Sequence, residues 1–345
     1  MISKEEFAYR FEPRRRPYED DPNWDIFLAE FSRSHPELDS YRNAFFLIEN
    51  GIGDQVCVLG LLRAFREHFQ AKNIIVIAQE KSRDLLRLFD TFDYAISKES
   101  LPGFISASNG RTFNVLHRPS KSFSNYGRLG PVFNAFAVPY IDQYKIGMGL
   151  PLSAPFAPPS TKKLSPGGVY SELGNKSVIL FPYSNTWQSA PIKFWQRLAD
   201  VLNAAGFEVW TNVLNKVASA SSRQPASRST ESDPLCNTKA LRCSLPELVN
   251  FADNSAGIIS SVSGPAWLLA NTRTLKTIIY EDCTFPAAWV RNAEQTELLS
   301  IYDIESLSKN FPTEAFHELV LSYVEESSWD KKIDSIVQKL SGQTP

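Results

Sequence analysis

The chain has 345 residues, more than one ordinary hydrophobic core organises, so we expect two domains. Apolar residues make up 43% and charged residues 21%, as in typical soluble globular proteins. No stretch reaches the roughly 18 apolar residues of a transmembrane helix. The net charge of −2 gives no electrostatic reason to expect nucleic-acid binding. The four cysteines and four histidines are scattered without metal-ligand spacing, so no metal site is expected and a reduced, cytoplasmic setting fits.

Residues 1–40 are polar and charged and are interpreted as an N-terminal arm over the first domain. Apolar residues between Trp24 and Phe31 have helical spacing and predict one short amphipathic helix. The run Arg14–Arg16 has two readings. It contacts anionic lipid heads at the inner face of a membrane, or it is a solvated surface, which the acidic residues that follow favour.

The stretch 45–56 carries the most informative local pattern. Four apolar residues, 45–48, predict a buried strand. Gly51 and Gly53 permit a tight turn and the close approach of a ligand to the backbone. Asp54 follows at the start of an apolar stripe with helical spacing, where a helix exposes unpaired N–H groups and a partial positive charge. Asp54 therefore either caps this helix or serves a functional role in the turn.

Strands alternate with helices after this unit, which indicates βαβ units and a parallel sheet in a first domain over residues 41–150. Residues 120–128 are expected to form a loop. Prolines and glycines are concentrated between residues 150 and 168, and 151–175 is interpreted as an interdomain linker. The predicted elements are further strands at 73–78, 93–97 and 113–117 and a helix at 81–89.

A second α/β series follows over residues 176–310, and Gly206 is expected to end its first helix. The segment 311–345 is expected to be mostly helical. The predicted elements of the second series are strands at 177–181, 207–211, 256–262 and 275–280 and helices at 194–205, 245–252 and 266–271.

Two tandem α/β sheets form a cleft between the carboxyl ends of their strands, where open α/β folds bind ligands. Three strand-to-helix junctions are expected to face it: 51–54, 182–186 and 260–265. The third is the better phosphate site, because its residues are small and its helix start could cradle a diphosphate; a plain N-cap is the alternative. Lys193 neutralises phosphate charge or is an ordinary surface lysine. Neither a Walker motif nor GxGxxG is present, so ATP hydrolysis and dinucleotide binding are unsupported.

Four short motifs follow one another along the chain. The first is Asn50-Gly-Ile-Gly-Asp54 before an apolar helix, and the second is Lys193-Phe-Trp195 after the strand that ends at Pro182. Ser244-Leu-Pro-Glu-Leu248 and then Ser263-Gly264-Pro265 follow. In this order the motifs resemble those of the heptosyltransferase-type enzymes of glycosyltransferase family 9.

The resemblance implies a GT-B fold, an α/β architecture of two Rossmann-like domains with parallel sheets facing a central cleft. It also implies that the segment 311–345 packs back on the first domain. The implied reaction is inverting transfer of a sugar from a nucleotide-diphosphate donor, with no metal or other cofactor. Asp54 would be the general base on the acceptor hydroxyl, and Lys193, Ser263 and Gly264 would hold the diphosphate. Further donor contacts would come from Ser184, Asn185 and Thr186.

Two positions depart from the family pattern: Val262 stands where the family has Asp, and Trp267 stands where it has His. Both positions line the family's donor site, so the donor need not be ADP-heptose, and Trp267 either stacks on a base or sugar ring or packs in its helix. The favoured function is glycosyl transfer to a cell-surface glycan, such as lipopolysaccharide core, O-antigen or capsule. Two alternatives stay open: a catalytically silent GT-B module that binds a partner or glycan, and a nucleotide-sugar epimerase, against which the few histidines argue.

Overall fold

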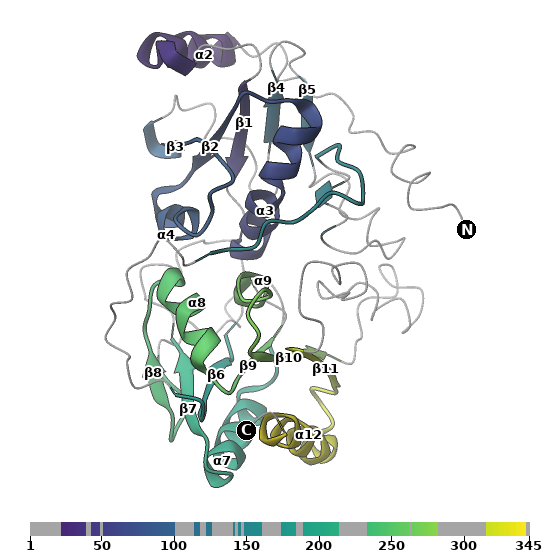
Figure 1. Ribbon diagram of the computed structural model, residues 1–345. Coiled ribbons are helices and arrows are strands. Elements are labelled where there is room, and N and C mark those ends of the chain that lie inside the picture. The colour runs from purple at the N-terminus through teal and green to yellow at the C-terminus, as the bar shows by residue number, and fades with distance from the viewer. Residues whose placement is uncertain are drawn as a thin grey trace, which may run out of the picture. The chain divides into compact units, whose positions relative to one another are not determined.

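The described residues of the computed structural model fall into two compact units (Figure 1). The first unit takes its described residues from 22–160, and the second takes them from 174–281 and 315–342. The described ranges are 22–38, 43–48, 51–100, 114–117, 122–125, 141, 144–145, 148–160, 174–183, 189–213, 233–261, 264–281 and 315–342.

In the first unit, the described strands lie in the order β3-β2-β1-β4-β5. As predicted, β1 (Asn43–Ile48), β2 (Asn73–Ala78) and β3 (Tyr94–Ser97) are parallel. β4 (Asn114–His117) instead runs antiparallel to β1, and β5 (Ser122–Asn125) pairs with β4 where a loop was expected. Residues 118–121 alone separate β4 from β5, and a parallel pair would need a crossover of about a dozen residues.

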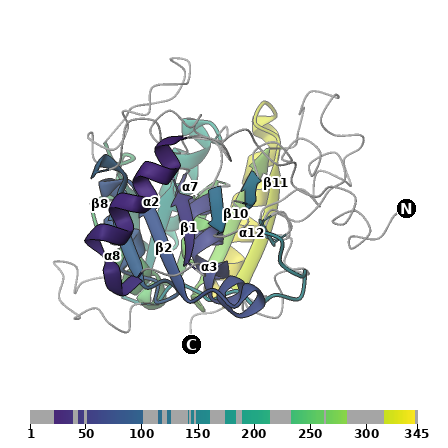
Figure 2. The ribbon, with the colours of Figure 1, turned by 90° about the horizontal axis from the view of Figure 1, so that it is seen from above.

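Helices cover both faces of this sheet. Successive side chains of β1 point to opposite faces, and two neighbouring residues of this strand contact different helices. Phe45 contacts Phe31 of α2 (Pro22–Ser34), with ring centroids 5.2 Å apart. Phe46 contacts Phe65 of α3 (Ile52–Phe69) at 4.9 Å. The helix α2, in dark purple, is seen across the strands in Figure 2. The short helices among the described residues of this unit are η2 (Pro36–Leu38), η3 (Glu80–Ser82), α4 (Arg83–Leu86) and η4 (Lys98–Ser100).

The first part of the expected linker is packed against the first unit. The ring of Phe156 lies directly against Gly60 of α3, where an added Cβ would come within 2.2 Å of it. The Ala157 N–H donates to the Gly60 carbonyl at 2.7 Å, and the Ser160 N–H donates to the Leu88 carbonyl at 2.8 Å. Residues 151–160 therefore belong to the first domain, and residues 161–173 lie outside the described ranges.

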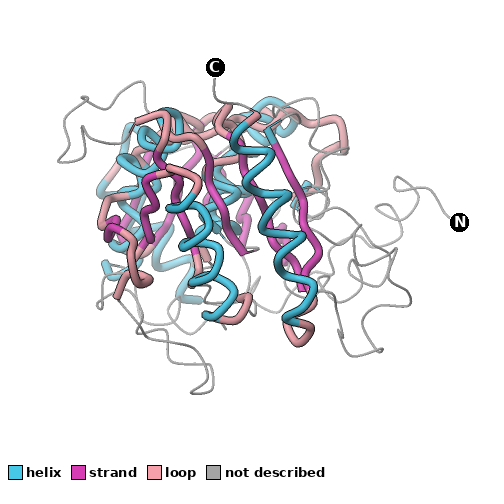
Figure 3. Tube along the Cα trace, turned by 90° about the horizontal axis from the view of Figure 1, so that it is seen from below, coloured by secondary structure: helices cyan, strands magenta, loops and turns pink. Residues whose placement is uncertain are grey.

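The described sheet of the second unit is wholly parallel, in the order β11-β10-β9-β6-β7-β8. From β6 the chain builds outward through β7 and β8, then returns to the other side of β6 with β9. This is the doubly wound order of a Rossmann-like domain, with helices (cyan) packed along strands (magenta) in Figure 3. The strands are β6 (Ser177–Phe181), β7 (Glu208–Asn212), β8 (Lys239–Leu241), β9 (Gly257–Ser261), β10 (Leu275–Glu281) and β11 (Phe316–Leu321).

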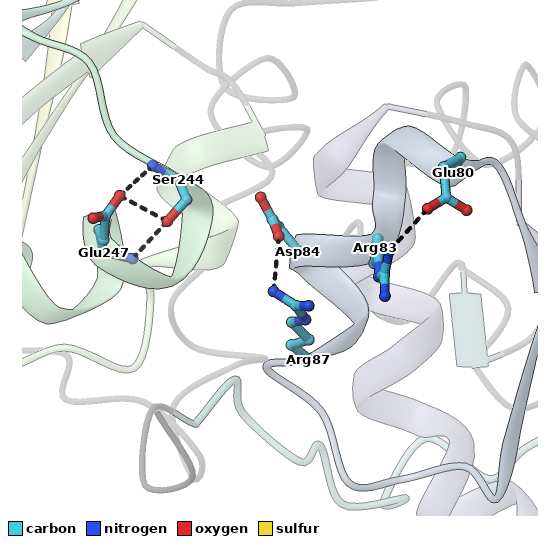
Figure 4. Close-up of polar contacts among 6 residues, drawn as sticks. All are labelled: Glu80, Arg83, Asp84, Arg87, Ser244 and Glu247. Atoms are coloured by element: carbon cyan, nitrogen blue, oxygen red, sulfur yellow. Dashed lines mark hydrogen bonds and ion pairs between the residues drawn. The ribbon is translucent and has the colours of Figure 1, made fainter. Parts of the chain in front are cut away.

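Local sequence sets the helix ends in the second unit. α8 (Leu245–Asn254) begins with a capping box, in which the Ser244 N–H donates to the Glu247 carboxylate at 2.7 Å and the Ser244 hydroxyl accepts from the Glu247 N–H (Figure 4). α7 (Ile192–Ala204) ends as predicted, because Gly206 takes a positive φ of 86°. The other helices that the structure describes in this unit are α9 (Gly264–Leu268), η8 (Glu326–Ser328) and α12 (Trp329–Ser341).

The C-terminal segment differs from the expectation. It was expected to be mostly helical, but residues 316–321 form β11, which extends the second sheet beside β10. The apolar face of α12 packs on α7 of the same unit: Trp329 contacts Phe194 at 5.7 Å between ring centroids. Leu340, near the end of α12, lies against Gly257. The described C-terminal residues are therefore part of the second unit.

Candidate active site

Asp54 lies in the first turn of α3, the helix that follows β1 along the chain. The N-cap of this helix is Gly51, and no side-chain hydrogen bond caps it. The interpretation of Asp54 as the N-cap residue is therefore wrong. Its carboxylate is half-buried at the positive end of an 18-residue helix, where a negative charge is stabilised.

The backbone conformation of Gly51 does not require a glycine. Its φ of −60° and ψ of 164° are open to any residue, so the tight-turn argument does not apply at this position. A Cβ added at Gly51 would lie 3.6 Å from Oδ2 of Asp54. The missing side chain thus leaves the backbone bare beside the carboxylate. Gly53 lies within the first turn of α3 itself.

Tyr144 is the residue that sequence reasoning missed. Its hydroxyl donates a hydrogen bond to Oδ1 of Asp54, and its side chain is fully buried in the first unit. The two residues are 90 positions apart, and no periodic pattern links them. The site in this unit is therefore a carboxylate with a tyrosine on one oxygen and a glycine beside the other.

Cys57 lies three residues after Asp54 in α3 and interacts with its charge. Burial raises the pKa of this thiol well above its usual value, and the negative charge of Asp54 raises it further. Cys57 is therefore a neutral thiol at working pH and no nucleophile.

The second unit has its own candidate site, where β6 and β9 lie side by side with Phe181 opposite Ser260. The chain leaves these two strands toward opposite edges of the sheet, which makes their carboxyl ends the topological switch point. Doubly wound sheets bind ligands at this point. Pro182 follows β6 and Ser261 ends β9, so these residues mark the site.

Ser189 joins the two strand ends at the switch point. Its hydroxyl donates to the Pro182 carbonyl and lies 2.9 Å from the hydroxyl of Ser261. It also accepts a hydrogen bond from the indole N–H of the buried Trp195 at 3.1 Å. The predicted Lys–Trp motif thus supplies, through Trp195, an anchor for the segment before α7.

The predicted donor residues are distributed as follows. Lys193 is in the first turn of α7, with its side chain 77% exposed and its ammonium 3.6 Å from the Glu326 carboxylate. Gly264 begins α9 and is half-buried. Trp267 is 1% exposed, so packing in its helix is the reading that the structure supports. The predicted residues that lie outside the described ranges are Ser184, Asn185, Thr186, Val262 and Ser263.

Two further properties concern the described residues only. They contain no group of three or more histidine, cysteine, aspartate or glutamate side chains that could hold a metal ion. None of the described helices combines the length and apolar character needed to cross a membrane.

No family model matches the chain, and no curated protein matches it in sequence. Its structure is similar to that of ADP-heptose LPS heptosyltransferase II of E. coli, with a TM-score of 0.52 and 12% identity over 86% of this chain and 98% of that chain. A glycosyltransferase family 9 protein of Veillonella parvula gives 0.48 and 12% identity over 86% and 96% of the two chains. An E. coli heptosyltransferase with ADP gives 0.48 and 9% over 85% and 98%.

The first of these similarities spans both units and assigns the chain the GT-B fold of two Rossmann-like domains. The fold that the sequence motifs indicated is thereby confirmed. At 12% identity this similarity establishes the fold alone. The chemistry depends on the particular residues that this chain places at its site.

Proposed function

We propose that this protein is an inverting glycosyltransferase that moves a sugar from a nucleotide-diphosphate donor to a glycan acceptor without a metal. The observation that carries the proposal is the Asp54 carboxylate in the first turn of α3. It is half-buried, with Tyr144 on Oδ1 and the bare backbone of Gly51 near Oδ2. A carboxylate held in this way at a strand-to-helix junction is suited to act as the base on an acceptor hydroxyl.

In this reaction Asp54 accepts the proton of the acceptor hydroxyl while the hydroxyl oxygen attacks the anomeric carbon of the donor sugar. The new carbon–oxygen bond forms on the face opposite the diphosphate. The bond from the anomeric carbon to the diphosphate oxygen breaks, and the nucleotide diphosphate leaves with the electron pair. The configuration at the anomeric carbon inverts. The protein then needs a base for the acceptor and N–H or cationic groups for the leaving diphosphate.

The second unit supplies the donor groups in this proposal, because its switch point has the architecture that binds nucleotides. Lys193 would exchange Glu326 for a phosphate oxygen. Both side chains are exposed, and an exposed ion pair contributes only about 0–1 kcal/mol, so the exchange costs little. The other diphosphate contacts that we propose are Ser184, Asn185, Thr186, Ser263 and Gly264.

We propose a cell-surface glycan as the acceptor: lipopolysaccharide core, O-antigen or capsule. The similar E. coli protein is an ADP-heptose LPS heptosyltransferase, which makes ADP-heptose the first donor to test. Transfer would take place in the cytoplasm or at the inner face of the membrane, where such acceptors are built on lipid carriers.

The test is a screen of nucleotide-diphosphate sugars in the presence of EDTA, with release of the nucleotide diphosphate as the readout. ADP-heptose comes first, followed by ADP-, GDP- and UDP-hexoses, each with and without a lipopolysaccharide-core acceptor. Release that depends on the acceptor, with inverted anomeric configuration in the product, supports the proposal.

The absence of release and of thermal stabilisation by every nucleotide at millimolar concentration contradicts it. That result favours the silent binding module, because Trp267 is buried and presents no ring for a donor to stack on.

A further inference from the structure

The hydroxyl of the buried Tyr144 donates a hydrogen bond to a carboxylate, that of Asp54. The hydroxyl of a buried tyrosine needs a polar partner, and a backbone carbonyl satisfies that need. Here the partner is the carboxylate that we propose as the base, which lies in α3, 90 residues away along the chain in the same unit. The hydrogen bond is of the charge-assisted kind, which is stronger and more directional than a bond between neutral groups.

The segment that carries Tyr144 is anchored at several points. The Met148 N–H donates to the Tyr144 carbonyl at 2.9 Å, and the Leu150 N–H donates to the Lys145 carbonyl at 2.8 Å. The ammonium of the buried Lys145 donates to the Leu152 carbonyl at 2.7 Å. A tyrosine also has few side-chain torsions to fix, so its hydroxyl is presented at a defined place.

We propose that Tyr144 is the positioning residue of Asp54, which holds Oδ1 so that Oδ2 is directed to the bare backbone of Gly51, where the acceptor hydroxyl approaches. A carboxylate without such a partner rotates about its last torsion and spreads both oxygens over a range of directions. The Cβ that Gly51 lacks would lie 3.6 Å from Oδ2, so this oxygen is the one with open backbone beside it. The inference rests on the proposed function of Asp54 as the base.

The test is Tyr144→Phe, which keeps the ring and removes the donor. We expect kcat to fall roughly tenfold to a hundredfold, because the base is no longer aligned. The acidic limb of the pH profile of kcat/KM should move to higher pH, since the lost hydrogen bond favoured the charged carboxylate. Cys57 adds no limb in this range, because burial and the charge of Asp54 raise its pKa.

Two measurements make the test independent of the assay and of the fold. A carbon-13 NMR titration of the Asp54 carboxyl should show the same upward shift in Tyr144→Phe, whether or not a donor is known. Replacement of Tyr144 by 3-fluorotyrosine keeps the packing and makes the hydroxyl a stronger donor, so the titration should move down instead.

Tyr94→Phe is the matched control, because Tyr94 is an exposed tyrosine on β3 of the same unit. Tyr94→Phe should change neither kcat nor the acidic limb of the pH profile of kcat/KM. A Tyr144→Phe protein with lower stability but an unmoved limb and an unmoved Asp54 titration would overturn the inference. A wild-type protein that turns over no donor contradicts the proposed function instead, so the two failures are distinguishable.

Discussion

The two units use the same α/β plan in different ways. The second unit has a wholly parallel, doubly wound sheet whose strand ends are tied together at the switch point through Ser189. The first unit adds an antiparallel hairpin to its sheet and carries a half-buried carboxylate, Asp54, held by a buried tyrosine. In the proposed function, the strand order of the second unit indicates where the donor binds, whereas one pair of side chains, Asp54 and Tyr144, indicates the catalytic group of the first unit.

This division of roles has a measurable consequence. Substitutions around Asp54 should change turnover and leave donor binding intact. Substitutions at the switch point should change donor binding and leave the chemical step nearly intact.

Gly51→Ala should lower turnover more than the core-glycine and serine substitutions that follow it. The added methyl group would lie 3.6 Å from Oδ2 of Asp54, in the space that the acceptor hydroxyl needs. We expect kcat/KM for the acceptor to fall roughly tenfold to a hundredfold. Steady-state kinetics and thermal unfolding should show an unchanged donor KM and Tm, because alanine adopts the backbone angles of Gly51 without strain.

Gly174→Ala is the matched control, since a Cβ there meets nothing within 4 Å. Full acceptor turnover by Gly51→Ala would show that the approach to Asp54 does not pass Gly51.

Alanine substitutions at one core glycine of each unit should lower the free energy of unfolding by different amounts. A Cβ at Gly60 would lie 2.2 Å from the ring of Phe156, and a Cβ at Gly257 would lie 2.2 Å from a methyl group of Leu340. A leucine methyl can swing aside, whereas the segment with Phe156 is also held by the Ala157 N–H. Gly60→Ala should therefore lower the free energy of unfolding by about 1–3 kcal/mol, and Gly257→Ala by less.

Urea unfolding of both variants, with tryptophan fluorescence and circular dichroism, measures this difference. Equal losses of unfolding free energy in the two variants would mean that the segment with Phe156 and Ala157 moves aside as easily as the side chain of Leu340, and would contradict this prediction.

Ser189→Ala should have the smallest effect. It removes the acceptor of the Trp195 indole N–H and the hydroxyl next to Ser261, at a cost of about 1 kcal/mol in stability. The donor KM should rise several-fold because the ends of β6 and β9 are less firmly held, and kcat should stay near that of the wild type. A fall in kcat at saturating donor, with an unchanged KM, would contradict the division between the units.

Much of the fold follows from short apolar runs. β1, β2, β6, β9 and β10 were predicted because buried parallel strands are almost continuously apolar. β11 was not, because Phe316, Leu319 and Val320 fit a helical period. The buried side chains of β11, Leu319 and Leu321, are instead two positions apart, and the buried Tyr323 continues this spacing just after the strand. This period of two was also present in the sequence. A strand that contains His317 and Glu318 resembles an amphipathic helix more than a buried strand.

The candidate site was predictable only in part. Asp54 was found because the strand, the glycines and the helix that place it are contiguous in the chain. Tyr144 and Ser189 were not found, because each acts through a contact that only the folded chain creates, across 90 residues in one case and 72 in the other. Trp267 shows the reverse: its position suggested a ligand contact, and its burial assigns it to packing.

The most direct test of the central claim is the single-turnover rate of Asp54→Asn at saturating donor and acceptor. Asparagine keeps the shape of the side chain but cannot take a proton, and the N-cap of α3 is Gly51, so the helix should hold. We predict a rate roughly a hundredfold to ten-thousandfold below that of the wild type, with nucleotide binding and Tm retained. A rate equal to that of the wild type would contradict the role of Asp54 as the base.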